Sequence, residues 1–491
     1  MNYNEKFKKI CEEARLVGAS NVIVRNDEIV NTVNYGYKSL SSKEEVTTDT
    51  IFRIASISKT VAAIGLMQLV EQKKINLDDD ISKYFGFKIR NPKYPDDVIT
   101  VKMITTQTSS ITDGYDDEGD LPANTSVTMG YNGVNGTSYD ASLEDLLIPS
   151  DSIFYTPLTY SDYRPGERFI YSNFGCGLMA CLIEIASKEY FTDYMINHVF
   201  KPLNIDASYM PYDIQRKDLI ADMYYPKDGS YEVSRTAESF YKKPYKRYPL
   251  GQNYRGPAGG LFISMNDLST IMRMFLNKGT VNNVKLLEKE TVEYMYQMQW
   301  FGNGDDGGYR SKGIQMKVLD VFEYPFRGHT GGAYGVRSYM YFDMKNQVGG
   351  CFITNGGYYE KKSYSVMIDI FHLTIKNMIT EFYPKTKEST LKINLNSNVL
   401  EVDNRHIIMS EKMFYKDNEL FIPAISLSDG LGIVALYDEN KNTVTFRKNN
   451  KEITFINLER VNNVQMVSLD KVLTGLNLPK DQINNIIYIK Y

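Results

Sequence analysis

Apolar residues recur along this chain at helical spacing in some segments and at strand spacing in others. Apolar positions at helical spacing predict amphipathic or buried helices, and β-branched runs joined by a short polar turn predict hairpins. The predicted elements are a helix over 5–17, a hairpin from 21–24 and 29–37, a buried helix over 56–72, a helix over 178–187, a second hairpin from 336–342 and 349–353, and a helix over 366–379. This order predicts an α/β fold, an antiparallel sheet flanked by helices with a helical region inserted in its middle.

Two stretches depart from this pattern. Residues 114–165 are rich in Asp, Gly, Asn, Ser, Thr, Tyr and Pro, and they predict a long loop excursion with little regular structure. After about residue 385 the chain becomes rich in Asn, Ile, Val and Lys and alternates apolar with polar residues, as short strands do. Two weak repeats in this tail each predict a strand, a short helix and a strand. We therefore predict one domain over 1–385 and a small α+β module over 386–491.

Composition and charge exclude several classes of protein. The 491 residues carry a net charge of -4 and 43% of them are hydrophobic, which fits a globular chain rather than a basic nucleic-acid-binding protein. Four histidines and four scattered cysteines form none of the common zinc motifs, so we expect no metal and no cofactor.

The N-terminus bears on the location of the protein. Residues 1–20 are charged throughout and lack the apolar core of a signal peptide, and no run along the chain is long enough to span a membrane. As written, the chain is expected in the cytoplasm. If a leader was trimmed, the cell envelope or secretion is expected instead.

The first candidate for chemistry is a Ser-x-x-Lys motif at the start of the predicted buried helix. Ser56 and Lys59 lie one turn apart on one face, and a buried lysine that has lost its proton can act as the base for a serine nucleophile. The same spacing recurs from Ser239, Ser389 and Ser468, but only Ser56 opens a long apolar helix. A plainer interpretation is a helix-capping serine followed by a solvated lysine.

Two further segments could contribute to the same site. Tyr171-Ser172-Asn173 offers a phenol as a proton shuttle and an amide that can hold a substrate carbonyl, although a packed tyrosine at a turn would explain it equally. The Gly-rich stretch 327–335, at the start of a predicted strand, would let a backbone approach a ligand closely and offer an N–H to an oxyanion. A Gly-rich strand start without any function is the alternative.

Taken together, Ser-x-x-Lys, Tyr-Ser-Asn and His329-Thr330-Gly331 resemble the motifs of the penicillin-recognising serine hydrolases, which include class C β-lactamases, D,D-carboxypeptidases and D-aminopeptidases. Segments 47–56, 99–109 and 257–264 are also similar, and the resemblance covers about 5–380. It implies a β-lactamase/transpeptidase-like fold. The roles that it implies are nucleophile for Ser56, base for Lys59, proton relay for Tyr171, substrate contacts for Asn173, His329, Thr330 and Gly331, and an oxyanion hole from the N–H groups of Ser56 and Gly332.

One departure from the family pattern concerns substrate choice. His329 stands where most β-lactamases and penicillin-binding proteins carry a lysine, so a permanent cation for a substrate carboxylate is missing there. Arg310, Arg327 and Arg337 are the nearby cations that could replace it. Histidine at this position is similar to D,D-carboxypeptidase, D-aminopeptidase and esterase branches.

The tail resembles the copper amine oxidase N-terminal-like, or stalk, module through Ile422-Pro423 and Leu431-Gly432. We expect a wall-binding or spacer element that needs no copper. The whole chain is thus predicted to be a serine acyl-hydrolase acting through an acyl-enzyme on D-amino-acid peptides or esters, similar to a D,D-carboxypeptidase. Its partners would be a small-molecule or peptide substrate, with peptidoglycan fragments among the candidates. The alternatives are a class C type β-lactamase and a non-catalytic wall-binding or β-lactam-sensing protein.

Overall fold

The computed structural model describes residues 1–114, 130–135, 141–242, 247–302, 310–319, 324–357, 364–384, 388–448 and 450–491. The predicted domain boundary at 385/386, and residues 115–129 and 136–140 of the predicted excursion over 114–165, lie outside these residues. The described part of that excursion is not all loop, because it contains α5 (Gly130–Asn135), α6 (Leu143–Leu147) and the short 3₁₀-helix η1 (Pro157–Thr159).

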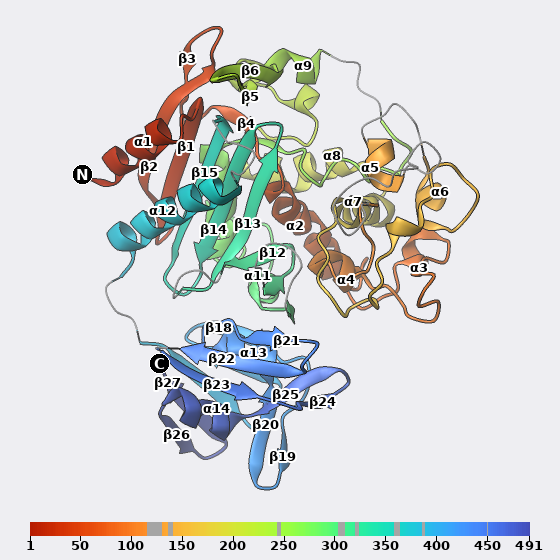
Figure 1. Cartoon of the computed structure of the whole chain (residues 1–491), viewed down its shortest axis with the longest axis vertical. Coiled ribbons are helices and arrows are strands. Elements are labelled where there is room, and N and C mark those ends of the chain that lie inside the picture. The colour runs from red at the N-terminus through yellow and green to blue at the C-terminus, as the bar shows by residue number, and fades with distance from the viewer. Residues whose placement is uncertain are drawn as a thin grey trace.

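A nine-stranded sheet forms the centre of the larger part of the molecule (Figure 1). The strands lie in the order β10-β11-β12-β13-β14-β15-β1-β2-β3, and every neighbouring pair is antiparallel. Their bounds are β1 (Gly18–Arg25), β2 (Glu28–Ser39), β3 (Glu44–Glu45), β10 (Trp300–Phe301), β11 (Ser311–Gly313), β12 (Met316–Leu319), β13 (Phe326–Ala333), β14 (Val336–Asp343) and β15 (Val348–Gly356).

Both predicted hairpins are confirmed, as β1–β2 and β14–β15. The first turns through Asn26 and Asp27, whose positive φ angles suit a tight hairpin turn. The two hairpins then join each other, since β1 pairs with β15 and places Val22 opposite Cys351. Strands from the two ends of this part of the chain are therefore neighbours in one sheet.

Helices cover both faces of the sheet. On one face α1 (Tyr3–Glu13) and α12 (Tyr364–Phe382) pack on a core that includes Phe7, Tyr339 and Phe352. On the other face lie α2 (Ile57–Glu71) and α10 (Met265–Leu276), within the largest buried cluster. α1 ends four residues before the predicted end, because Arg15 takes a left-handed conformation and the chain turns into β1. The predicted antiparallel sheet flanked by helices is confirmed.

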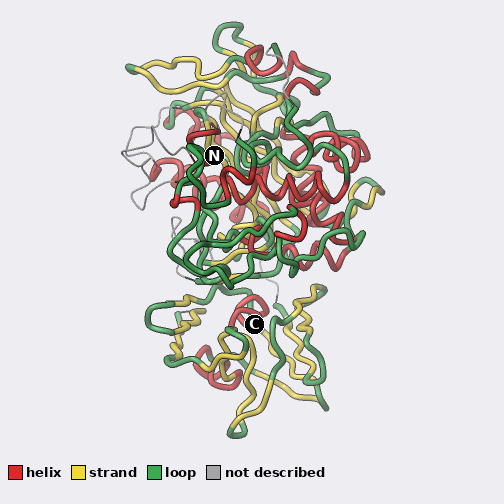
Figure 2. The backbone as a smooth tube through the Cα atoms, turned by 90° about the vertical axis from the view of Figure 1, so that its right-hand side faces the viewer, coloured by secondary structure: helices red, strands yellow, loops and turns green. Residues whose placement is uncertain are grey.

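The inserted helical region lies beside the sheet, and α2 runs between the two (Figure 1). Figure 2 shows the strand-rich tail below the larger part of the chain. The remaining helices of this part are α3 (Ser82–Phe85), α4 (Val101–Thr106), α7 (Asn173–Ser187), α8 (Phe191–Met195), the π-helix η2 (Ile196–Phe200), α9 (Ala237–Tyr241), α11 (Lys289–Tyr296), and the 3₁₀-helices η3 (Lys201–Leu203), η4 (Pro211–Asp213) and η5 (Lys217–Leu219). Short strand pairs complete it: β4 (Ile51–Arg53) with β7 (Phe262–Ser264), β5 (Met223–Lys227) with β6 (Ser230–Arg235), and β8 (Thr280–Val281) with β9 (Val284–Lys285).

The tail forms small antiparallel sheets around two helices. Its elements are β16 (Thr390–Asn394), β17 (Val399–Val402), β18 (Arg405–Ile408), β19 (Phe414–Lys416), β20 (Glu419–Pro423), α13 (Ala424–Gly430), β21 (Leu436–Asp438), β22 (Thr443–Lys448), β23 (Lys451–Phe455), β24 (Glu459–Val461), β25 (Val464–Ser468), α14 (Leu469–Leu476), β26 (Lys480–Ile483) and β27 (Ile486–Lys490). Strand, helix and strand occur in each half as predicted, and β20 pairs with β25.

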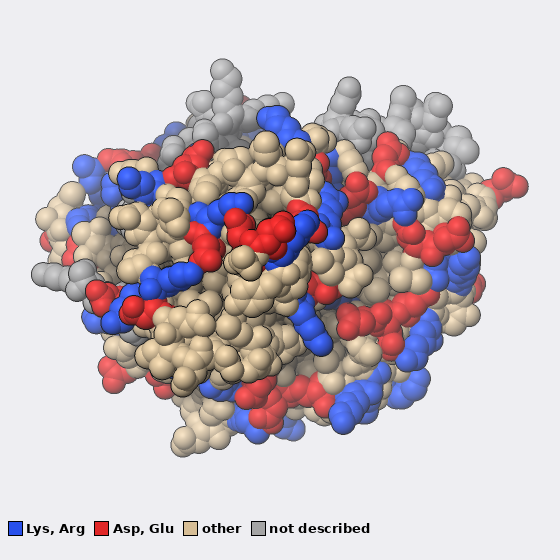
Figure 3. Space-filling model, turned by 90° about the horizontal axis from the view of Figure 1, so that it is seen from below, with Lys and Arg blue, Asp and Glu red and all other residues tan. Residues whose placement is uncertain are grey.

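The tail packs directly against the larger part of the chain. Its buried core takes in Met298, Phe301 and Val318, which belong to or border β10 and β12. Seen from below, acidic and basic side chains are interspersed over the molecule (Figure 3). Within the described ranges no helix has the length and apolar character needed to cross a bilayer.

Candidate functional site

Ser56 lies at a strained turn between β4 and α2. Ala55, the residue before it, has φ +50°, a left-handed conformation that costs energy for any residue with a Cβ. Ser56 takes the position of a helix cap, but its hydroxyl makes no capping hydrogen bond. The interpretation of Ser56 as an ordinary capping serine is therefore wrong, and its oxygen is available for other partners.

Lys59 lies one helical turn after Ser56 and is completely buried. Its Nζ donates to Ser56 Oγ at 3.1 Å, to Asn173 Oδ1 at 2.9 Å and to the carbonyl of Ala258. Burial lowers the pKa of Lys59 from 10.5 to about 8, because the ammonium loses its hydration. The amine can thus be neutral near physiological pH, which a solvated lysine cannot.

Tyr171 completes the contact with Ser56. Its phenol donates to Ser56 Oγ at 2.8 Å, and its ring centroid lies 5.0 Å from Lys59 Nζ. Residues 115 positions apart thus meet on one oxygen atom. The structure brings Ser56, Lys59, Tyr171 and Asn173 into one hydrogen-bonded cluster.

Asp113, which the sequence did not single out, holds the Tyr-Ser-Asn segment in place. One carboxylate oxygen accepts from Ser172 Oγ at 3.1 Å and from the N–H of Phe174 at 2.8 Å, and the other accepts from Asn173 Nδ2 at 2.8 Å. This leaves Asn173 Oδ1 facing Lys59. No motif marks Asp113, and only its burial and its partners reveal the role.

The third candidate segment, residues 327–335, does not lie at the start of the predicted strand 336–342. Most of it forms a strand of its own, β13. Gly331 lets this strand lie against the turn before Ser56, since a Cβ at this position would come 2.5 Å from the carbonyl oxygen of Ile54. Ser338 on the neighbouring β14 donates to that same oxygen at 2.9 Å. Thr330 is partly exposed and Gly332 is exposed, so solvent can reach both.

His329 is buried, with its ring centroid 6.1 Å from that of Tyr171. Its Nδ1 lies 2.5 Å from the carbonyl oxygen of Thr330, a contact that requires a proton on Nδ1. Burial, and then the charges of Lys317, Lys312 and Lys59, hold the pKa of His329 well below 6.5. The imidazole is therefore neutral at neutral pH, and its Nε2 finds no hydrogen-bond partner within the described residues.

The cations beside His329 come from lysines that the sequence did not single out. Lys317 on β12 places its Nζ 4.8 Å from the centroid of the Tyr171 ring. Lys312 on β11 is paired with Lys317 across the sheet, and its Nζ lies 4.4 Å from the Phe169 ring. Of the predicted cations, Arg327 cannot bind substrate, because it is buried and its guanidinium donates to Asp429 at 2.8 Å.

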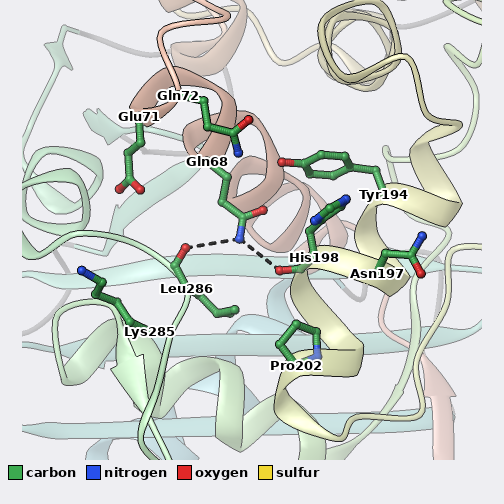
Figure 4. A pocket seen from close by; sticks show the side chains of 9 residues that line it. All are labelled: Gln68, Glu71, Gln72, Tyr194, Asn197, His198, Pro202, Lys285 and Leu286. Atoms are coloured by element: carbon green, nitrogen blue, oxygen red, sulfur yellow. Dashed lines mark hydrogen bonds between the residues drawn. The ribbon is translucent and has the colours of Figure 1, made fainter.

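A separate pocket of about 260 Å³ lies near the far end of α2, lined by Gln68, Glu71, Gln72, Tyr194, Asn197, His198, Pro202, Lys285 and Leu286 (Figure 4). None of the predicted site residues contributes to it. Among the described residues, no group of three or more His, Cys, Asp or Glu side chains is placed to hold a metal ion.

Two families match the chain. The family described as Beta-lactamase matches residues 4–365, and the one described as Copper amine oxidase N-terminal domain matches residues 377–472. Both resemblances inferred from motifs are thereby confirmed.

Curated relatives match parts of the chain. Protein flp of Staphylococcus aureus (strain MRSA252) is 27% identical over 194 residues, 40% of this chain and only 35% of that protein. N-acetylmuramyl-L-alanine amidase of Bacillus subtilis (strain 168) is 25% identical over 339 residues, 64% of this chain and 72% of that protein.

Solved structures share the fold. D-amino acid amidase from Ochrobactrum anthropi SV3 has a TM-score of 0.57 at 19% identity and covers 77% of this chain and 99% of its own. The octameric penicillin-binding protein homologue from Pyrococcus abyssi has a TM-score of 0.57 at 17% identity and covers 99% of both chains. The predicted β-lactamase/transpeptidase-like fold is confirmed.

Proposed function

The chain belongs to the beta-lactamase family of serine hydrolases, and we propose that it forms an acyl-enzyme at Ser56 on D-amino-acid peptides, amides or esters. The observation that carries this proposal is the environment of one oxygen. Ser56 Oγ makes no capping bond and lies 3.1 Å from a buried amine and 2.8 Å from a phenol. Such an oxygen has a base and a proton donor within reach.

In the proposed acylation step, neutral Lys59 takes the proton of Ser56 as Oγ attacks the substrate carbonyl carbon. The N–H groups of Ser56 and Gly332 would stabilise the oxyanion. Tyr171 then gives its proton to the leaving group as the carbonyl–leaving group bond breaks. Return of the proton from Lys59 to the Tyr171 oxygen restores both groups for attack by water on the ester.

The lowered pKa of Lys59 predicts the pH dependence of acylation. Because only the neutral amine accepts a proton, kcat/KM for an uncharged ester should rise with pH and level off above about pH 8. His329 is neutral throughout this range and should add no second rise. A pH–rate profile on an uncharged ester checks this. A rate that is flat between pH 6 and 9 would contradict the role of Lys59 as base.

D-amino-acid substrates are proposed from two considerations. The histidine at position 329 resembles the pattern of the D,D-carboxypeptidase, D-aminopeptidase and esterase branches. D-amino acid amidase also has the same fold. The similarity to an amidase named for a muramyl substrate adds cell-wall fragments to the candidates. On this proposal the protein acts like a D,D-carboxypeptidase.

Lys317 would supply the cation that His329 lacks. Lys317 lies on β12, the strand paired with β13, and its ammonium lies beside the ring of Tyr171. We propose that it contacts a carboxylate on the leaving side of the substrate. We expect Lys317→Met to lower kcat/KM roughly 30-fold or more for an acyl-D-alanyl-D-alanine peptide, the cost of removing one partner of a buried charge pair. The same peptide with a C-terminal amide should lose much less. Equal losses on the two peptides would contradict carboxylate binding by Lys317.

Intact-mass measurement after incubation with a penicillin and with a D-alanyl-D-alanine peptide tests the proposed function. A slowly lost adduct on Ser56 with the penicillin and release of D-alanine from the peptide are expected. Rapid turnover of a cephalosporin would favour the β-lactamase alternative. No adduct and no product with any of these compounds would favour a non-catalytic receptor.

A further inference from the structure

The carboxylate of Asp429 joins the tail to the catalytic part of the chain. Asp429 lies on α13 and its side chain is fully buried. Its Oδ1 accepts from Arg327 at 2.8 Å and from Arg405 at 2.9 Å, and its Oδ2 accepts from the N–H of Met298 at 2.8 Å. Arg327 and Met298 belong to the hydrolase part, while Arg405 belongs to the tail. A buried charge of this kind is stable only when its partners stay in place.

Arg327 carries this contact to the catalytic strand. It lies on β13, two residues before His329, and it is almost fully buried. Its Nε donates to the carbonyl of Tyr296 at 3.3 Å, Nη1 donates to the carbonyl of Pro325, and the guanidinium carbon lies 4.6 Å from the Tyr296 ring centroid. The side chain is therefore held on every side and has no freedom to bind another group.

A second set of contacts fixes the same interface. Gln297 and Ile408 exchange two hydrogen bonds, from Gln297 Nε2 to the Ile408 carbonyl at 2.7 Å and from the Ile408 N–H to Gln297 Oε1 at 2.8 Å. Glu293, buried on α11, accepts from the His406 N–H at 3.1 Å. Separating the tail would break these hydrogen bonds, so they help to hold the tail in one position.

β13 transmits its position directly to the site. From Arg327 to Ala333 the strand pairs with β14 without a register shift. Its far half lies against the turn before Ser56, where Gly331 leaves room for the Ile54 carbonyl and Ser338 on the paired β14 donates to that carbonyl at 2.9 Å. A displacement at Arg327 would therefore move His329, Thr330 and the N–H of Gly332. Misplacement of such groups by about 1 Å can cost a hundredfold in rate.

We propose that the tail is a positioning part of the hydrolase, with Asp429 acting through Arg327 to fix β13 beside Ser56. The tail then does more than act as a spacer, because Arg327 holds one end of the catalytic strand at Asp429, while Gly331 on the same strand passes close to Ile54. In the part of the chain that the structure describes, neither Arg327 nor Asp429 makes a hydrogen bond to Ser56, so both act through β13.

The test compares full-length variants in the rate of Ser56 labelling by a fluorophosphonate and in hydrogen exchange of the β13 amides. Arg327→Met leaves Asp429 paired with Arg405 and Met298, so no charge is left buried alone. Asp429→Asn breaks the contact from the other side. The control is Leu473→Ala, which weakens the tail core at α14, a helix that packs on β20, β22, β23 and β25 of the tail. All variants are measured at a temperature well below their thermal unfolding midpoints.

Arg327→Met and Asp429→Asn should each slow labelling about tenfold or more and speed exchange of the β13 amides by a similar factor. The double variant should lose no more than the larger single loss, because both changes cut one connection. Leu473→Ala should stay within about twofold of wild type in both measurements. Wild-type labelling and β13 exchange in a folded Arg327→Met protein would overturn the proposal. Hydrogen exchange reports on β13 even if Ser56 reacts poorly with the fluorophosphonate. An error in the positioning role can therefore be told apart from an error in the proposed acyl-enzyme chemistry, on which this inference rests.

Discussion

Ser56→Ala should abolish covalent labelling of the protein by a penicillin and by a fluorophosphonate. Ser56 Oγ is the atom on which the Lys59 amine and the Tyr171 phenol converge, and alanine removes it without filling the space. The hydroxyl makes no capping hydrogen bond, so its loss should leave α2 intact. Intact mass should show no adduct, while the unfolding midpoint stays close to that of wild type.

The chain contains its own matched control for this variant. Ser239 has the same Ser-x-x-Lys spacing but lies on the short α9, where its hydroxyl donates to the Thr236 carbonyl and Lys242 is exposed. Ser239→Ala should label like wild type. An adduct that persists in Ser56→Ala, or is lost in Ser239→Ala, would place the nucleophile elsewhere.

Lys59→Met should lower the acylation rate roughly a thousandfold or more, the scale seen when the base of a serine nucleophile is removed. Methionine keeps the buried stem but accepts no proton, so the rise of the rate toward pH 8 should disappear as well. Single-turnover acylation across pH measures both effects. Lys242→Met, in the exposed copy of the motif, should behave like wild type. Near-wild-type kinetics in Lys59→Met would mean that another group is the base.

A stability measurement separates the loss of acylation rate in Lys59→Met from simple unfolding. The pKa of Lys59 is lower in the folded protein than in the unfolded chain, so the unfolded state binds more protons between about pH 8 and 10.5. The amine therefore destabilises the fold below about pH 8, and this cost disappears as the pH rises toward 10.5. Lys59→Met should be at least as stable as wild type at neutral pH in thermal unfolding. Such a trade of stability for reactivity is common at active sites.

Local elements and local pairs were predictable from the sequence. The separation of Ser56 and Lys59 is one turn of a helix, so their contact follows from the periodicity of α2 alone. Both hairpins likewise depend on short turns between neighbouring strands. The bounds of α1 were less predictable, because Arg15 ends the helix through its backbone conformation while the apolar spacing continues to Val17.

Which charged groups surround the site could not be predicted in the same way. The apolar spacing marks no difference between Arg327, which turns to Asp429, and Lys317, which lies beside Tyr171. The positions of these two side chains depend on the pairing of β12 with β13 and on the docking of the tail. Asp113 is similar, since an aspartate in a polar stretch has no visible reason to be buried until Asn173 is brought to it.

By itself, the sequence determined the helix that carries Ser56 and the order of the elements, because these follow from spacing along one chain. The type of chemistry was implied by the resemblance of three motifs to one family. Tertiary structure decided which amine is stripped of water, which carboxylate orients Asn173 and which end of β13 is anchored to the tail. These properties depend on burial and on contacts between residues more than 50 positions apart. Desolvation and Coulomb interactions act between neighbours in space, and the chain order does not specify those neighbours.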